Sequence, residues 1–134
     1  MIGGMVVFKA ALVVSLLALF GCGKKAEQCN SVATVSNVGV TSVGKLKLEK
    51  PTDFEEGAKI LEKTASDMKA LAIADAKLKS LNDAYADSFA ARATLMRQVA
   101  KATDETLDKG VKDINAAISN EYKLVDQITA YCKE

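Results

Sequence analysis

The stretch PTDFEEGAKILEKTASDMKALA, residues 51–72, carries a strong helical pattern. Thr52 follows Pro51, and Glu55 stands three positions after Thr52, which is the spacing of a capping box with Thr52 as the cap. Apolar residues then recur at alternating intervals of four and three, so they share one face of an amphipathic helix. The residues of this face are Phe54, Ala58, Leu61, Ala65, Met68 and Ala72.

Two further amphipathic helices are predicted downstream. Residues 73–75 offer a break, and Asp75 is suited to cap the helix that follows. Asp104 and Glu105 come after Thr103, and acidic residues favour the first turn of a helix. Cys132 falls on the apolar face of the last helix, so we expect its side chain to point inward. The apolar faces comprise Leu78, Leu81, Tyr85, Phe89, Met96 and Val99 in one helix, and Leu107, Val111, Ile114, Ile118, Tyr122, Val125, Ile128 and Cys132 in the other.

The segment between Cys29 and Leu48 is ambiguous. It is rich in β-branched valine, and the sequence VGVTSV (residues 38–43) is also compatible with a strand. A single strand would have no partner for its edges, and every other segment reads as helical. We therefore favour a helix from about Asn30 to Lys45, with a strand as the alternative.

Four helices with short connections predict an all-α fold, an up-down-up-down four-helix bundle over residues 29–134. The composition agrees, because aromatic residues make up 5% of the chain and there is one proline. The chain has 18 basic and 17 acidic side chains, a formal net charge of +1. A nearly neutral chain has no electrostatic reason to bind nucleic acid, so no nucleic-acid partner is expected.

The N-terminus has the layout of an export signal. Lys9 is the only charged residue before position 24, and residues 10–20 are apolar apart from Ser15. This apolar run is shorter than the about 20 residues that a membrane-spanning helix needs. We therefore predict a signal peptide over residues 1–21. An ordinary cleaved signal without lipid and an uncleaved anchor helix are the alternatives.

The sequence Leu19-Phe20-Gly21-Cys22 resembles the lipobox of bacterial lipoproteins, although Phe20 stands where a small residue is commoner. The resemblance implies that Cys22 carries lipid and becomes the first residue of the mature chain. Residues 22–28 would then form a lipidated tether. With Gly23 rather than aspartate after the cysteine, it also implies delivery to the outer membrane, with membrane lipid as a partner. We expect the protein on the periplasmic side of that membrane, with the cell exterior as the alternative.

Two cysteines remain once Cys22 is assigned to lipidation. Cys29 and Cys132 are an even pair in an exported, oxidising setting, which predicts a structural disulfide between them. A redox or metal site is the alternative, but the chain has no CxxC spacing and no histidine. In an up-down-up-down bundle these two positions lie at the same end, so the pairing and the topology support each other.

No residue pattern predicts catalysis, a metal site or a bound cofactor. The absence of histidine removes the commonest general base, and the acidic pairs at 55–56 and 104–105 are explained by helix first turns. Met68 and Met96 are predicted as core residues. Arg92 lies near an apolar face, where it would pair with Asp87 or with a carboxylate across the bundle, or mark a small groove.

The mature part resembles small, uncharacterised helical lipoproteins of myxobacteria and related bacteria. The resemblance rests on Cys29-Asn30-Ser31-Val32 and on Ile128-Thr129-Ala130-Tyr131-Cys132, and it implies no activity. We expect a structural or protein-binding lipoprotein rather than an enzyme, with a partner protein of unknown identity. The alternative is an escort protein similar to the pilotins of secretion systems, which predicts a groove for a partner helix. A cell-wall spacer similar to the murein lipoprotein is disfavoured.

Overall fold

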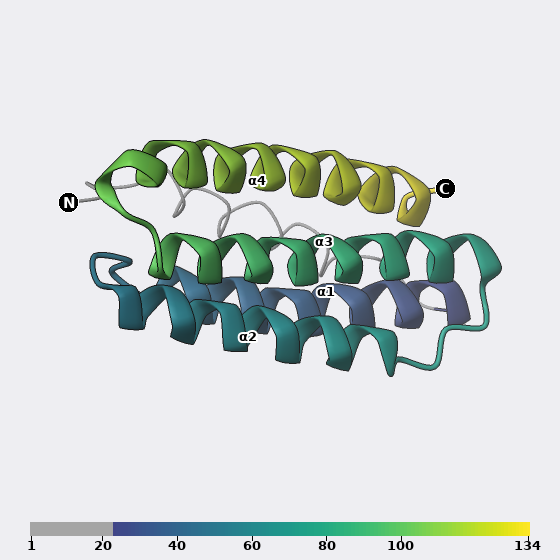
Figure 1. The fold of residues 1–134 in the computed structure, drawn as a ribbon. Coiled ribbons are helices and arrows are strands. Elements are labelled where there is room, and N and C mark those ends of the chain that lie inside the picture. Colours follow the sequence, from purple (N-terminus) through teal and green to yellow (C-terminus); the bar gives the residue numbers. More distant parts are fainter. Residues whose placement is uncertain (1–22) are drawn as a thin grey trace.

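The computed structural model describes residues 23–134, and these form four α-helices and no strand (Figure 1). The helices are α1 (Lys24–Gly44), α2 (Pro51–Lys69), α3 (Ala76–Ala100) and α4 (Asp104–Cys132). The predicted all-α class is confirmed for this part of the chain. Residues 30–45 lie almost entirely in α1, so the strand alternative is wrong. The predicted signal peptide and Cys22 lie outside the described residues.

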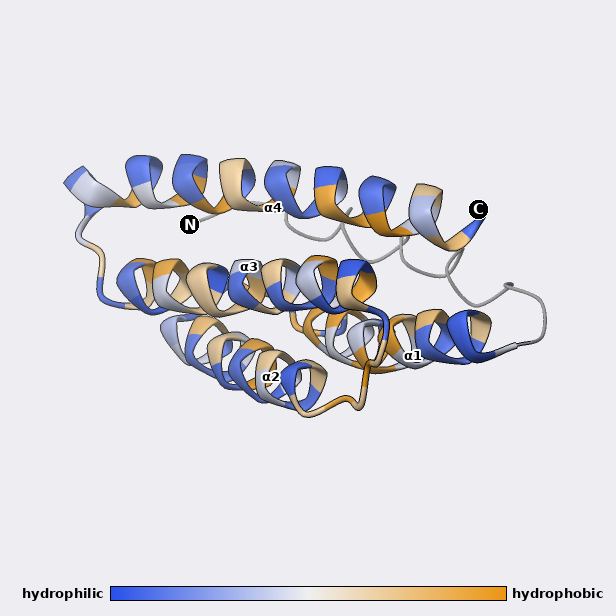
Figure 2. Ribbon diagram, turned by 90° about the vertical axis from the view of Figure 1, so that its right-hand side faces the viewer, coloured by the Kyte–Doolittle hydropathy of each residue, from blue (hydrophilic) through white to orange (hydrophobic). Residues whose placement is uncertain are grey.

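Each helix packs mainly on its neighbour in sequence. The closest associations are α2 with α3, α3 with α4, and α1 with α2, whereas α1 makes few contacts with α3 and α4. Figure 2 shows that the hydrophobic residues of α4 lie on the side of this helix that is turned toward α3. The side of the bundle between α1 and α4 is therefore the least tightly joined.

The predicted apolar faces form most of the core. In α2 all the predicted positions except Ala72 are buried, and in α3 all six are buried. Ala72 is exposed because α2 ends at Lys69, and Ile73 in the following connection is buried instead. In α4 the buried members are Ile114, Ile118, Val125 and Ile128, and the remaining members are partly buried: Leu107, Val111, Tyr122 and Cys132.

Two of the predicted helix starts are confirmed. Asp75 caps α3 by accepting a hydrogen bond from the Leu78 backbone N–H at 2.8 Å, and α4 begins at Asp104 directly after Thr103. The predicted cap at Thr52 is wrong. Helix α2 already begins at Pro51, and Asp53 accepts hydrogen bonds from the backbone N–H groups that precede it. Proline is favoured at this first position because its fixed φ suits a helix and it has no N–H to satisfy.

Helix α1 begins earlier than predicted. It starts at Lys24 rather than near Asn30, so most of the predicted tether over 22–28 is the first turn and a half of the helix. The Gly23 carbonyl accepts a hydrogen bond from the Glu27 N–H, and Gly23 has a φ of 124°, which favours glycine. Glu27 in the first turn suits the positive end of the helix dipole.

Gly39 sets the close approach of α1 to α2. A Cβ atom at this position would overlap the side chain of Thr64, which is branched and held by a hydrogen bond to the Ile60 carbonyl. A side chain at position 39 would therefore push the two helices apart.

Gly39→Ala is expected to lower the free energy of unfolding by about 1–3 kcal/mol, because overpacking outweighs the gain in helix propensity. Urea unfolding measures the change. Thr41→Ala on the exposed side of the same helix is the control and should stay within about 0.5 kcal/mol of wild type. A Gly39→Ala protein as stable as wild type would show that the helices do not approach this closely.

Candidate functional site

A groove of about 330 Å³ runs along the outer side of the bundle between α1 and α2. Its lining is mostly apolar, and Val38 at its edge is 64% exposed, the highest exposure of any large hydrophobic residue in 23–134. The exposed apolar side chain and the apolar hollow beside it make this groove the candidate binding surface of the described residues. The lining residues are Thr34, Val35, Val38, Gly39, Ser42, Ile60, Lys63, Thr64 and Asp67.

Two hydroxyl groups of this groove are satisfied within their own helices. The Ser42 hydroxyl donates to the Val38 carbonyl at 2.7 Å, and the Thr64 hydroxyl donates to the Ile60 carbonyl at 2.8 Å. The two charged residues at the rim, Lys63 and Asp67, form an ion pair with each other at 2.6 Å. An occupant could therefore cover the groove without leaving these polar groups unpaired.

The outer surface of α1 carries no charge along most of its length. Residues 29–44 contain no Asp, Glu, Lys or Arg, although 26% of the chain is charged. Several of these residues are nevertheless exposed, among them Ser31, Thr34, Val38 and Thr41. A solvated helix surface is normally charged or strongly polar, so this uncharged surface is unusual.

A buried ion pair joins α3 to α4. The Nε atom of Arg92 lies 3.0 Å from Oε2 of Glu121, and the two side chains are 2% and 5% exposed. Neither atom makes a hydrogen bond within the described structure, so their attraction is electrostatic. Arg92 thus pairs across the bundle, one of the predicted alternatives, whereas Asp87 pairs with Lys69 on the surface.

Two titratable groups beside this pair are shifted by burial. Burial raises the pKa of Glu121 to about 7, although the charge of Arg92 acts to lower it. Burial also raises the pKa of Tyr85, whose hydroxyl interacts with Ser36 of α1. This polar cluster therefore connects three helices inside an otherwise apolar core.

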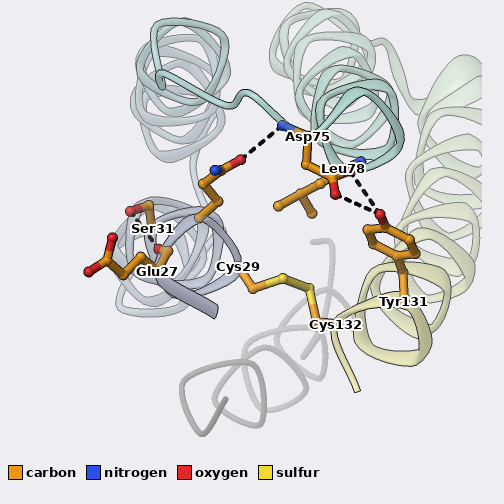
Figure 3. The surroundings of a disulfide bond; sticks show 8 residues. Glu27, Cys29, Ser31, Asp75, Leu78, Tyr131 and Cys132 are labelled. Carbon is orange, nitrogen blue, oxygen red and sulfur yellow. Dashed lines mark hydrogen bonds between the residues drawn. A yellow bond between two sulfur atoms is a disulfide. The ribbon is translucent and has the colours of Figure 1, made fainter. Parts of the chain in front are cut away.

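The disulfide end of the bundle joins three segments of the chain (Figure 3). Cys29 and Cys132, the pair that the sequence predicts, are bonded with 2.01 Å between the sulfur atoms and 6.1 Å between the Cα atoms. The Tyr131 hydroxyl donates to both carboxylate oxygens of Asp75, at 2.9 and 2.7 Å. The Asp75 backbone N–H in turn donates to the Gln28 side chain at 3.1 Å. The start of α1, the connection between α2 and α3, and the end of α4 therefore meet here.

Charge interactions add to this contact. The Lys25 ammonium lies 4.0 Å from the centre of the Tyr131 ring. The hydrogen bond from the Leu78 N–H is the main cause that lowers the pKa of Asp75, and the bond from the Tyr131 hydroxyl is the next. The hydrogen bond to the Asp75 carboxylate in turn raises the pKa of Tyr131. Asp75 is thus held in its charged form at the start of α3.

The remaining candidates from the sequence have structural roles. Met68 and Met96 are buried in the core. Glu55 lies beyond the first turn of α2, which corrects the prediction for that acidic pair, and it contacts Arg97 of α3 at 3.4 Å. Arg97 also pairs with Glu62. Within residues 23–134 no group of three His, Cys, Asp or Glu side chains is placed to hold a metal ion.

Sequence reasoning missed the burial of Glu121 and the position of the groove, and only Glu121 had a visible signal. Glu121 stands seven residues after Ile114 and four before Val125, so it occupies the apolar face of α4. We assigned that place to the neighbouring Tyr122, which is only partly buried. The groove had no comparable signal, because it depends on how closely two helices approach.

The chain matches no protein-family model, no curated protein and no solved structure. In the part of the chain that the structure describes, none of the helices combines the length and hydrophobicity needed to cross a bilayer.

Proposed function

We propose that this chain is a lipid-anchored, non-enzymatic lipoprotein of the bacterial outer membrane that faces the periplasm and binds protein through the α1–α2 groove. The resemblance of residues 19–22 to a lipobox supports the anchor. The observation that carries the binding role is the apolar groove with Val38 exposed at its edge. For an exported protein, contact with a partner protein would remove this apolar surface from water.

The proposed topology is an up-down-up-down bundle. Contacts between residues at matching heights support it. Asn82 near the start of α3 donates to the carbonyl of Met68 near the end of α2, and Arg92 lies beside Glu121. The Cys29–Cys132 bond places the start of α1 beside the end of α4.

The proposed orientation places the disulfide end at the membrane. Helix α1 begins at Lys24, two positions after Cys22, so almost no chain separates the lipid from the bundle. A helix of 21 residues is about 31 Å long. The groove, whose α1 residues lie between 34 and 42, would then stand away from the bilayer surface, where protein partners can reach it.

A pilotin-like escort role is the second candidate. That role requires a groove that receives a helix of an outer-membrane or secretion-system protein, and the apolar lining of the α1–α2 groove supports it. A bundle with a closed, wholly polar surface would not meet it.

Cys22→Ala is expected to abolish lipidation and cleavage, because lipid attachment needs the thiol. Intact mass spectrometry of the protein from membranes should give residues 22–134 with fatty-acyl additions for wild type and an uncleaved, unacylated chain for the variant. The matched control is the double variant Cys29→Ala/Cys132→Ala, which should still be acylated. An unacylated wild-type chain would contradict the anchor.

The binding role is tested separately in living cells. A photo-crosslinking amino acid at position 38 should form a covalent adduct with a protein, whereas the same group at position 123, on the exposed side of α4, should not. Equal labelling from both positions, or none from position 38, would contradict a docking site in the groove.

A further inference from the structure

The α1–α2 groove needs an occupant without charge. The hydroxyl groups of Ser42 and Thr64 are bonded within their own helices, and its rim charges neutralise each other. A charged occupant would lose its hydration and find no free opposite charge in the groove. The occupant that fits is therefore a helix with small, uncharged side chains.

Helix α1 itself has this chemistry. Residues 29–44 carry no charge, while the exposed surfaces of α2, α3 and α4 each carry several charged residues. Ser31, Val35, Val38 and Ser42 recur at spacings of four, three and four, which is the spacing along the seam of a two-stranded coiled coil. Both the projecting Val38 and the hollow beside Gly39 lie on this surface.

We propose that the occupant of the groove is α1 of a second copy of this chain, in a parallel, two-fold symmetric pair on the membrane. A two-fold pair uses the same patch on both copies, so the patch must present a projection and a hollow together, as this one does. This inference rests on the proposed anchor and docking surface, and it names the partner.

The anchor selects the parallel arrangement. In both copies α1 starts directly after Cys22, so both helices begin at the same bilayer and run away from it. One helix strip is smaller than the about 800 Å² per partner of a typical stable interface, so association in free solution would be weak. Confinement of both copies to one membrane raises their effective concentration and favours the pair.

The test uses the full lipidated protein in phosphatidylethanolamine–phosphatidylglycerol vesicles. Val38→Cys should form a disulfide between the introduced thiols of two chains under mild oxidation, and so should Ser31→Cys. A mixture of Ser31→Cys and Lys45→Cys chains should give no mixed 31–45 product, because that product requires an antiparallel pair. Lys123→Cys on α4 is the matched control and should stay monomeric.

A second variant separates association from folding. Val38→Lys places a charge in the seam and should raise the dissociation constant of the pair, measured by energy transfer between labelled chains, at least tenfold. Its thermal unfolding should equal that of wild type, because Val38 is mostly exposed.

The outcomes distinguish this proposal from the docking site itself. Same-position crosslinks, together with weaker association of Val38→Lys chains, would support the pair. Chains that stay monomeric in vesicles, or that give the mixed 31–45 product, would overturn it. An adduct from position 38 whose mass shows a different protein would also overturn the second copy, but it would leave the proposed binding role standing.

Discussion

Replacing both Cys29 and Cys132 with alanine is expected to lower the free energy of unfolding by about 4–5 kcal/mol. The two cysteines are separated by 103 positions, and a bond that closes a loop of this size restricts the unfolded chain strongly. For a domain of this size, the loss corresponds to a fall in Tm of roughly 15–25 °C. Thermal unfolding of the purified double variant measures it.

The local structure strengthens this expectation. Valine, threonine and glycine give α1 a low intrinsic helix propensity, and α1 makes few contacts with α3 and α4. The disulfide is therefore the main connection between α1 and α4. Its loss should expose the first turns of α1 to hydrogen exchange before the rest of the bundle opens.

Reductant provides the control for the cysteine experiment. Wild type should lose stability when dithiothreitol is added, and the double alanine variant should show no further change. A wild-type protein whose Tm is the same with and without reductant would contradict the role assigned to the bond.

Arg92→Met is expected to lower the free energy of unfolding by about 3–5 kcal/mol at pH 8, because Glu121 must then either bury an unpaired charge or take up a proton that the unfolded chain does not hold at this pH. The double variant Arg92→Met/Glu121→Leu should recover most of this loss, since it replaces the pair with apolar groups of similar volume. Urea unfolding of both variants measures the difference. If the double variant were as unstable as Arg92→Met, lost packing rather than the unpaired charge would be the cause.

The same pair makes stability depend on pH. Burial raises the pKa of Glu121 to about 7 in the folded chain, above its unfolded value of about 4.5. Between these values the folded state retains a proton that the unfolded state releases, so the contribution of Glu121 to stability decreases as the pH rises from about 4.5 to about 7. The lowered pKa of Asp75 acts in the opposite direction, but only below about pH 4.

Glu121→Gln isolates this effect. Unfolding in urea at pH 5, 6, 7 and 8 should show a loss of stability across this range in wild type and a flatter profile in the variant. In the Arg92→Met variant the loss of stability with rising pH should continue to higher pH, because the positive charge that lowers the pKa of Glu121 is gone. Identical profiles for wild type and Glu121→Gln would assign the pH dependence to other groups.

The features that depend on local pattern were predictable from the sequence. The period of apolar residues located the helices and most of the core, and Asp75 was recognised as a cap because capping involves neighbours in sequence. The predicted cap at Thr52 was wrong because Pro51 and Asp53 together favour a helix start two positions earlier, with Lys50 as the cap. The position where α2 begins depends on which backbone N–H groups donate hydrogen bonds to the Asp53 carboxylate.

The features that depend on tertiary packing were less predictable. Helix α1 has a composition that suits a strand nearly as well, and its contacts with α2 together with the disulfide favour the helix. Gly39 lets α1 approach Thr64 at the groove. The spacing of apolar residues along the sequence does not indicate how closely two helices approach. Glu121 could have been found, because a carboxylate on an apolar face requires a buried partner.

The position of the disulfide has a mechanical consequence. If the chain is anchored as proposed, a pull between the anchor and Glu134 would pass along the first turn of α1, across the sulfur–sulfur bond and out through Lys133. The chain between the two cysteines, which are 103 positions apart, would carry none of that tension. The disulfide would thus keep the tension out of most of the bundle, and the helix ends opposite the disulfide would stay folded under load.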